Sequence, residues 1–409
     1  MSSHLGLAYH LTHRGNAQHT RYGWLRLTPA YSVHVVADLL KRYALTGDIV
    51  LDPFGGSGTT ALACAERGIS CISTDINPFL VWLARAKTRA YTPAEVKCFQ
   101  QLANELIQHV DKVPPEVIWL PEIHQREKWW EPEVLSLLGA LLYQIHRLHD
   151  TFAEPVIDLL KVAFCRLVIS HSHASFNHQS MSFKKKCQPS LFSKIIDDLI
   201  LTWQESINDI IRSMQTPIIT LPAIHLHDAR QLTTLIPKET VSFVITSPPY
   251  PNRMSYIREL RPYMYWLGFL QNGRDAGELD WQAIGGTWGV ATSYVGRWSI
   301  PEDHGVPYPN FTDMIRRVAE HSDLLARYIA KYFVDMKQHI TELYKVTKSN
   351  ARIFYVVGNS KFYSVLVPTE QIIASLLQNM GFGEIEITLL RKRTSKKELY
   401  EYIVSARRS

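Results

Sequence analysis

The sequence has few cysteines, and they form no pattern. The five cysteines are scattered from Cys64 to Cys187, and no two have the C-x-x-C spacing. This distribution gives no basis for a disulfide framework or a cysteine-based zinc site. The histidines His171, His173 and His178 likewise have no cysteine or carboxylate at ligand spacing, so we expect no metal site.

Long apolar runs, internal repeats and low-complexity tracts are also missing. Segment 1–16 has no uninterrupted apolar stretch of the length a signal peptide needs, and the most apolar later segment, 134–148, is interrupted by polar residues. We therefore expect a cytoplasmic protein with no membrane association. With 409 residues, of which 46% are hydrophobic, the chain is long enough to bury one large core or two modest ones.

The charge of the chain is mildly positive. A formal net charge of +6 is compatible with a polyanionic partner but is shared by many proteins that have none. Two local clusters are more informative: Lys184, Lys185 and Lys186 are consecutive, and segment 391–397 (RKRTSKK) is strongly basic. Each cluster is either a contact for a polyanion or solvated surface.

The order of the predicted elements indicates an α/β fold. Strand, glycine turn, helix, strand and acidic residue follow one another between residues 49 and 75, the order of a nucleotide-binding α/β half. Strand-like runs return at residues 218–221, 241–246, 353–357, 385–390 and 402–405. Helical patterns separate some of these runs, as at 333–346 and 371–380. The alternation predicts a doubly wound, mostly parallel sheet.

Two segments interrupt this alternation. Between about 92 and 215 the apolar residues recur with the helical period of 3.6, which predicts a helical insertion. Residues 271–312 are polar and rich in Gly, Trp and Tyr; we expect a long loop there, and loops of that length are usually functional. The predicted parts are a sheet domain formed by 1–90 and 216–409, a helical insertion at 91–215, and a loop insertion at 271–312.

The most informative segment is LDPFGGSGTT, residues 51–60. Three glycines directly after a strand let the backbone approach a ligand and leave the N–H groups of the following helix unobstructed. No lysine follows, which excludes a Walker phosphate loop, and Thr59 stands where a nucleophile elbow around Ser57 needs its second glycine. Ala61 replaces the third glycine of a dinucleotide motif, a position that tolerates alanine in some proteins.

Asp75 lies at the end of the next predicted strand. A carboxylate there can accept hydrogen bonds from both ribose hydroxyls of an adenosine moiety, which indicates a nucleoside ligand. The alternative is that Asp75 caps the helix that starts near Asn77 and Pro78, and the two roles are compatible.

A second segment with chemical content is TSPPY, residues 246–250. Its two prolines stiffen the chain after an apolar strand and remove two N–H donors, so the carbonyls of Ser247 and Pro248 are expected to face a pocket. The ring of Tyr250 can stack on a planar ligand. A structural turn at the end of the strand is the alternative interpretation.

Together, DPFGGSGTT and TSPPY resemble motifs I and IV of the amino-methyltransferases that modify cytosine N4 or adenine N6 in DNA. The resemblance covers roughly 20–90 and 220–409, and not the helical insertion. It implies a Rossmann-like methyltransferase sheet, S-adenosylmethionine as the cofactor and double-stranded DNA as the partner. It also implies a restriction-modification or defence context, in which a cognate restriction endonuclease is a candidate partner.

The resemblance also assigns cofactor-binding residues. By motif, these are Pro29, Tyr31, Asp52, Pro53, Phe54, Gly55, Gly56, Ser57, Gly58, Thr59, Asp75, Ile76, Asn77 and Asp228. Segment 28–32 (TPAYS) resembles the stretch before motif I, and Asp228 resembles the acidic position near the cofactor adenine. Each of these two is equally compatible with a turn or a helix cap.

The catalytic platform implied by the resemblance consists of Ser247, Pro248, Pro249 and Tyr250. An amino nitrogen on an aromatic base is a poor nucleophile, because its lone pair is delocalised into the ring. Hydrogen bonds from its N–H groups to Ser247 and a proline carbonyl would favour a pyramidal, more nucleophilic nitrogen. We expect the base to be flipped out of the duplex. Serine rather than Asp or Asn at 247 favours cytosine N4 over adenine N6.

The remaining predictions concern DNA recognition and rival functions. The candidate DNA contacts are Lys184, Lys185, Lys186, Arg253, Arg391 and Arg393. Because the cofactor motif precedes the catalytic one, 91–215 resembles a target-recognition region, and 271–312 is a second candidate. Cytosine C5 methylation is disfavoured, since it needs a Pro-Cys nucleophile and Cys187 lies between Lys186 and Gln188. Methylation of RNA or of a protein glutamine, and a catalytically silent DNA-binding subunit, remain alternatives.

Overall fold

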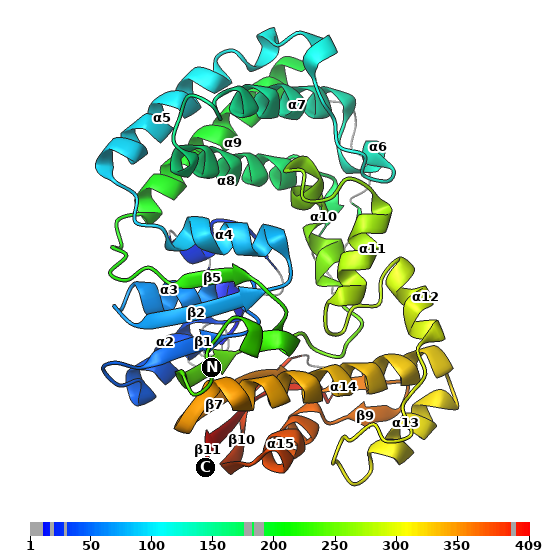
Figure 1. Cartoon of the computed structure of the whole chain (residues 1–409). Helices are drawn as coiled ribbons and strands as arrows, with labels where there is room; N and C mark the ends of the chain where they lie inside the picture. Colours follow the sequence, from blue (N-terminus) through cyan, green and yellow to red (C-terminus); the bar gives the residue numbers. More distant parts are fainter. Residues whose placement is uncertain (1–10, 17–19, 28–30, 176–181, 184–191, 394–397) are drawn as a thin grey trace, which may run out of the picture.

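The computed structural model describes residues 11–16, 20–27, 31–175, 182–183, 192–393 and 398–409. Within these residues, seven strands form one central sheet: β1 (Ile49–Asp52), β2 (Ser70–Asp75), β5 (Ala223–Leu226), β6 (Val241–Thr246), β7 (Thr347–Gly358), β10 (Phe382–Lys392) and β11 (Tyr400–Arg408). Their order across the sheet is β10-β11-β7-β6-β1-β2-β5 (Figure 1). Among these strands, only β11 runs in the direction opposite to the other six, which confirms the mostly parallel sheet.

Helices cover both faces of this sheet. On one face lie α2 (Val33–Tyr43) and α3 (Thr59–Ala65), and on the other lie α14 (Asp323–Val346) and α15 (Thr369–Met380). Successive strand residues alternate between the two cores: Val50 packs with α2 and α3, and Leu51 packs with α14. The strands are therefore apolar on both faces, as expected for a doubly wound parallel sheet.

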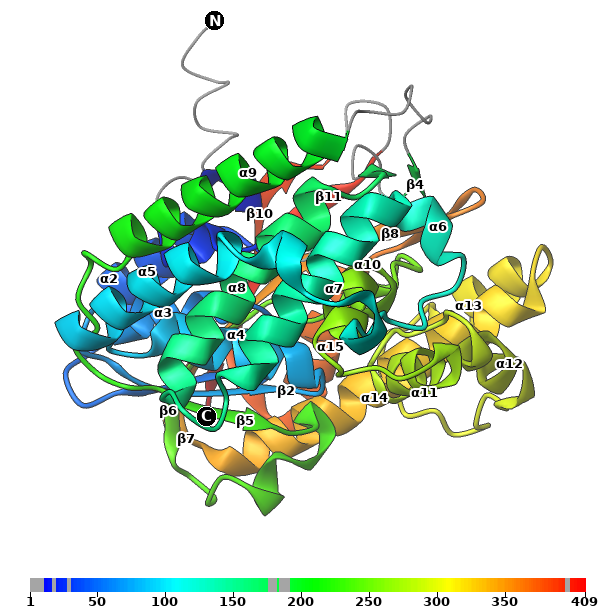
Figure 2. The same cartoon turned by 90° about the horizontal axis from the view of Figure 1, so that it is seen from above.

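The predicted helical insertion is present. Its helices are α5 (Pro93–Ile107), α6 (Arg126–Trp129), α7 (Pro132–Arg147), α8 (Glu154–Ser170) and α9 (Phe192–Ser213), with a short hairpin of β3 (Ala174–Ser175) and β4 (Ser182–Phe183). Thr92 starts α5 with a capping box, in which Thr92 and Glu95 each bond the other's backbone N–H. Figures 1 and 2 show these helices as a layer beyond α4 (Pro78–Thr88), away from the strands.

The structure corrects the loop predicted at 271–312. About half of that segment is helical, because it contains α11 (Gly273–Gln282), α12 (Val290–Arg297) and the start of α13 (Phe311–Ala319). Asn272 forms a capping box with Asp275 at the start of α11. Asp280 then accepts hydrogen bonds from Ser255 Oγ and the N–H of Trp288, both at 2.6 Å. These helices are too short for a clear helical period, so composition alone suggested a loop.

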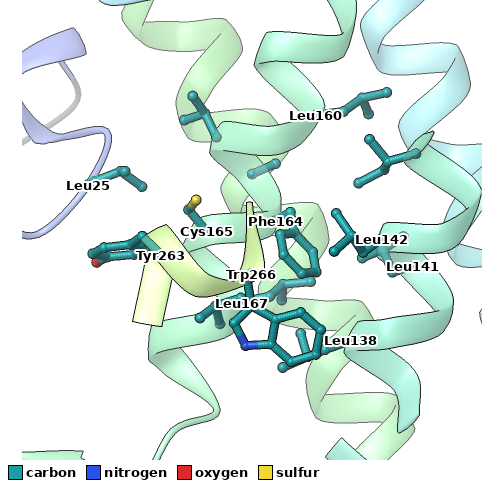
Figure 3. Close-up of a cluster of buried hydrophobic side chains, with 14 of the residues drawn as sticks. Leu25, Leu138, Leu141, Leu142, Leu160, Phe164, Cys165, Leu167, Tyr263 and Trp266 are labelled. Carbon is teal, nitrogen blue, oxygen red and sulfur yellow. The ribbon is translucent and has the colours of Figure 1, made fainter. Parts of the chain in front are cut away.

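Helix α10 (Tyr256–Trp266) joins the sheet to the insertion. Figure 3 shows Tyr263 and Trp266 among residues of α7 and α8, including Leu138 and Phe164. The ring of Trp266 lies 5.6 Å from that of Phe164, centroid to centroid, and nearly perpendicular to it. Although α10 follows residue 216, its apolar face thus belongs to the same core as the insertion helices.

One predicted strand is wrong. Residues 217–222 are not a strand; Ile219 and Thr220 donate their N–H groups to the carbonyl of Ala65, and β5 begins at Ala223. The remaining elements are the hairpin of β8 (Ser360–Phe362) and β9 (Val365–Val367), and the 3₁₀ turns η1 (His13–Asn16), η2 (Arg21–Gly23), η3 (Val110–Lys112), η4 (Pro115–Val117) and η5 (Ala229–Thr234). No helix in the described part of the chain is both long enough and apolar enough to span a membrane.

Candidate active site

The glycine turn connects β1 to α3 at the point where the strand order reverses. From β1 the chain proceeds to β2 on one side, while β6 and β7 lie on the other. The carboxyl ends of β1 and β6 therefore flank the topological switch point, where ligands bind in open α/β sheets. Thr246, the last residue of β6, ties the two ends together by donating a hydrogen bond to Asp52 Oδ1 at 2.6 Å.

Two of the glycines are required by close packing. A Cβ on Gly55 would lie 2.0 Å from Ser73 Oγ, and one on Gly58 would lie 2.8 Å from the Cβ of Ala84. Gly58 also has a φ of 81° at the N-cap of α3, a conformation that favours glycine. The turn is thus pressed against β2 and α4, while Gly56, with a φ of 51°, faces a cavity.

Asp52 lies behind the cavity wall rather than in it. Its side chain is fully buried, and it accepts hydrogen bonds from Thr246, from the N–H of Phe54 at 3.2 Å and from Tyr31 at 3.4 Å. Burial raises the pKa of Asp52, against the effect of these hydrogen bonds. Tyr31 also bonds Thr60, so Asp52 and Tyr31 together connect the segment before α2 to the glycine turn.

Asp75, at the end of β2, lines the cavity with Ile76 and Asn77. Its two carboxylate oxygens accept hydrogen bonds from the N–H groups of Gly56 and Asn77, each at 2.8 Å. Burial raises the pKa of Asp75 to about 6, although these two bonds oppose the rise. Asn77, not Asp75, caps α4 by accepting from the N–H of Phe79. The carboxylate therefore fixes the glycine turn and keeps lone pairs free for a ligand.

Asp228 also lines the cavity, but it has a local partner. It caps η5 and accepts several hydrogen bonds from Arg230, the shortest at 2.7 Å from Nη2. Burial alone would raise the pKa of Asp228; the bonds from Arg230 outweigh it and lower the pKa. Asp228 is therefore ionised and oriented by the neighbouring arginine.

The segment Ser247–Tyr250 forms the facing wall of the same cavity. The carbonyl of Pro249 accepts a hydrogen bond from the Tyr332 hydroxyl at 2.7 Å, so it is already engaged. The hydroxyl of Tyr250 donates to Glu401 Oε1 at 2.8 Å, and the guanidinium of Arg393 lies 5.1 Å from the Tyr250 ring centroid. Burial, and then the charge of Glu401, raise the pKa of Tyr250 well above its ordinary value, so its hydroxyl stays protonated.

The cavity holds both motifs. Its volume is about 1190 Å³, larger than the roughly 300–1,000 Å³ of a typical small-ligand pocket. The predicted residues in its wall are Tyr31, Pro53, Phe54, Gly56, Ser57, Asp75, Ile76, Asn77, Asp228, Ser247, Pro248, Pro249, Tyr250, Arg253, Arg391 and Arg393. Gly56 and Pro248 thus share one cavity with room for a donor and an acceptor.

Some predicted residues lie elsewhere. Asp52, Gly55, Gly58 and Thr59 are behind the wall, where they shape the glycine turn. Pro29 and the lysines Lys184, Lys185 and Lys186 fall outside the described residues.

Two of the arginines predicted to bind DNA have partners inside the protein. Arg391 Nε donates to Glu401 Oε2 at 2.6 Å, and Arg393 Nη1 donates to the carbonyl of Asn359 at 3.0 Å. Their side chains thus brace the Tyr250 wall of the cavity. Arg253, in contrast, is exposed and has a φ of 60°, and its N–H donates to Tyr328.

Several polar residues of the cavity wall were not predicted from the sequence: Asn252, Tyr256, Asp280, Gln282 and Glu401. Glu401 is only 7% exposed, although it lies on a strand of the sheet. A lone carboxylate in an apolar strand pattern is a usable signal, because buried carboxylates are normally paired. Asp280 and Gln282 gave no such signal, since they lie in the segment that was predicted to be a loop.

Comparisons with known proteins agree with this geometry. Residues 13–86 match the N6_N4_Mtase family model, described as DNA methylase. The chain is 22% identical over 402 residues to Type II methyltransferase M.AvaI of Nostoc sp.. The alignment covers 92% of this chain and 82% of that protein. It is 20% identical over 449 residues to Type II methyltransferase M.BsoBI of Geobacillus stearothermophilus, covering 96% and 85%.

Two further similarities are shorter or weaker. Type II methyltransferase M.MjaII of Methanocaldococcus jannaschii is 44% identical over 63 residues, which is 15% of this chain and 12% of that protein. The solved rRNA methyltransferase aviRa of Streptomyces viridochromogenes aligns over 93% of this chain and 86% of its own, at 12% identity. Its TM-score of 0.28 is too low to carry an argument.

A mostly parallel sheet with a glycine turn, an acidic strand end and a proline platform around one cavity is typical of S-adenosylmethionine-dependent methyltransferases, and the similar proteins are named as methyltransferases. Within that class, the family model and the type II relatives support a DNA amino-methyltransferase.

Proposed function

We propose that this chain methylates an exocyclic amino group of a flipped-out base in double-stranded DNA, as the modification enzyme of a restriction-modification system. The observation that carries the proposal is the single cavity lined by both Gly56 and Pro248. Relatives named as type II methyltransferases along most of the chain support the same substrate.

The cofactor end of the cavity is the wall formed by the glycine turn and the end of β2. Asp75 has carboxylate lone pairs left after its two backbone bonds, and these suit the two hydroxyls of a ribose. Gly56 leaves the wall open where a side chain would fill it. Bound there, S-adenosylmethionine would supply a methyl group on a sulfonium, which is a good leaving group.

The target end is the wall formed by Ser247–Tyr250. Since Tyr332 occupies the carbonyl of Pro249, the acceptors left for an amino group are Ser247 and the carbonyl of Pro248. Hydrogen bonds from the amine to these acceptors localise its lone pair on nitrogen and aim it at the cofactor end. The main contribution of the chain is then alignment and the exclusion of water.

The base must leave the duplex to reach this wall, because its amine is paired inside the double helix. Tyr250 offers one ring face for stacking, since Arg393 lies over the other. Serine at 247 leads us to favour cytosine N4 over adenine N6. The insertion at 91–215 and the helical segment at 271–312 are the candidates for reading the DNA sequence.

The test is to incubate the protein with labelled S-adenosylmethionine and, separately, unmethylated duplex DNA, structured RNA and protein extract. We expect label in DNA, and digestion to nucleosides should yield N4-methylcytosine. N6-methyladenine would correct the target base alone. Label confined to RNA or protein would overturn the proposal.

A catalytically silent DNA-binding subunit is the rival from another class. The two proposals differ in cofactor binding, because a silent subunit does not need to bind S-adenosylmethionine. Calorimetric titration with S-adenosylmethionine should show saturable heat. A complete absence of heat would favour the silent subunit.

A further inference from the structure

Two arginines on α10 lie where the insertion meets the 271–312 segment. The guanidinium carbon of Arg261 is 4.4 Å from the ring centroid of Trp288, which follows α11, and 5.7 Å from that of Trp129 in α6. Arg258 is one turn earlier on α10, and its carbonyl accepts a hydrogen bond from Arg261 Nε at 3.1 Å. The two indoles therefore both attract the Arg261 guanidinium and restrict its movement.

Among the residues that the structure describes, this pair of cations has no counter-charge within ion-pair distance. In the described part of the chain, no carboxylate forms an ion pair with Arg258 or Arg261. Arginines elsewhere on nearby helices do have such partners, as Arg274 has Glu278 and Arg327 has Asp323. Burial, and then the like charge of Arg258, lower the pKa of Arg261 to about 10.

The acidic residue nearest in sequence does not relieve this repulsion. Glu259 is only 8% exposed, and it is turned by about 100° around the helix from Arg258. It is not among the groups whose charge shifts the pKa of Arg261. A desolvated cation beside a like charge is unfavourable without an anion, so the arrangement suits an anionic partner.

The position of the pair relates it to the cavity. Helix α10 begins in the cavity wall, where Tyr256 and Ile257 lie, and Arg261 is about 7.5 Å further along the helix axis, at about 1.5 Å per residue. The pair therefore lies on the same helix as part of the cavity wall, within reach of a strand that delivers a base to Ser247–Tyr250. The planar guanidinium group is also suited to two parallel hydrogen bonds with a phosphate.

We infer that Arg258 and Arg261 bind backbone phosphates of the DNA strand that carries the target base, with Trp129 and Trp288 orienting Arg261. This inference rests on the proposed function, because it needs a DNA strand at the cavity. It also links the two candidate recognition regions, since Trp129 belongs to one and Trp288 to the other.

The test measures equilibrium binding to an unmethylated DNA duplex over a series of salt concentrations. We compare the wild type with Arg258→Gln, Arg261→Gln and the double variant. Each lost phosphate contact reduces the slope of log affinity against log salt by about 0.9, so the double variant should lose about 1.8. Arg42→Gln removes the same charge from an exposed, paired position on α2, outside both candidate recognition segments, and should leave the slope unchanged.

Two further measurements distinguish a phosphate contact from a purely structural role of Arg261. Arg261→Lys keeps the charge but loses the planar group, so it should retain the salt slope, whereas a purely structural role would make it resemble Arg261→Gln. Calorimetric titration with S-adenosylmethionine should give the wild-type affinity for every variant, which checks that the fold is intact.

The outcomes distinguish this inference from the proposed function. Unchanged slopes in both glutamine variants, with a wild type that binds DNA, would overturn the arginine assignment alone. A wild type that binds no DNA in the presence of cofactor would overturn the proposed function with it. Tighter binding to structured RNA than to DNA, lost in the same variants, would replace DNA as the partner.

Discussion

The two walls of the cavity are built in different ways. The glycine wall is made by neighbours in sequence: β1, the turn, α3 and β2 all lie between residues 49 and 75, and Asp75 bonds Gly56 only 19 residues away. The platform wall depends on distant partners, because Glu401 holds Tyr250 from 151 residues away and Tyr332 holds Pro249 from 83. One wall is thus set by local chain geometry, and the other by the completed fold.

This difference predicts that substitutions in one wall mainly change kcat and substitutions in the other mainly change cofactor affinity. The largest effect is expected at Tyr250. Replacing Tyr250 by Ala removes the stacking ring, so we expect kcat to fall by about 100-fold or more, in the range seen when a positioned active-site group is lost. Cofactor affinity should stay near wild type, because Tyr250 lies at the target end. The measurement is steady-state methyl transfer together with calorimetric cofactor binding.

Tyr250→Phe is the matched control, since it keeps the ring and loses only the bond to Glu401. Its kcat should lie between those of the wild type and Tyr250→Ala. Equal losses of cofactor affinity and turnover in Tyr250→Ala would mean that the two walls do not have separate roles in cofactor binding and catalysis.

The corresponding change in the glycine wall is Asp75→Asn. Loss of the charged acceptor should weaken S-adenosylmethionine binding by about 1–3 kcal/mol, with a smaller effect on kcat at saturating cofactor. Asp38→Asn, at an exposed position on α2, is the control and should bind the cofactor normally. Normal cofactor affinity in Asp75→Asn would remove Asp75 from the cofactor site.

A smaller effect is expected from Gly358→Ala, which alters the platform wall without touching a ligand. The new Cβ would lie 2.8 Å from two ring atoms of Tyr250 and from Arg393 Nη1, so Tyr250 must shift. We expect kcat to fall by about tenfold, roughly the 1.4 kcal/mol cost of a displaced ring, and cofactor affinity to be kept. Gly273→Ala, which has no atom within 4 Å of the new Cβ, should leave both quantities unchanged.

The last prediction concerns how cofactor affinity and the stability of the fold change with pH. The pKa of Asp75 in the folded chain is about 6, above its ordinary value of 3.8, so the carboxyl is protonated below pH 6. Cofactor affinity should therefore decline by up to about tenfold per pH unit as the pH falls below 6. The same raised pKa makes the folded chain bind more protons than the unfolded one between pH 4 and 6, so this group stabilises the fold as the pH falls.

Titration calorimetry from pH 5 to 8 measures the first effect, and chemical unfolding over the same range measures the second. Asp75→Asn should abolish the decline in cofactor affinity below pH 6. A decline that persists in Asp75→Asn belongs to another group.

The sequence predicted the parts of the site that local chain geometry sets, and it did not predict the parts that depend on the completed fold. The glycine turn, Asp75 and TSPPY were predictable because each is a short segment whose geometry follows from its own residues. Glu401 and Gly358 were not, because only the sheet order places β7 beside β6, which leads into the TSPPY segment, and β11 beside β7. The helices at 273–297 were missed for a related reason: buried Asp280 fixes them through Ser255 and Trp288, and short helices have too few turns for a visible period.

The place of β11 in the sheet also sets the order in which the molecule can be completed. This strand is later in sequence than both of its neighbours, β7 and β10, and it fills the gap between them. During synthesis those two strands therefore wait with unpaired edges, the kind of surface on which nascent chains aggregate. Glu401 arrives with the same strand, so Tyr250 gains its anchor at the moment the sheet closes.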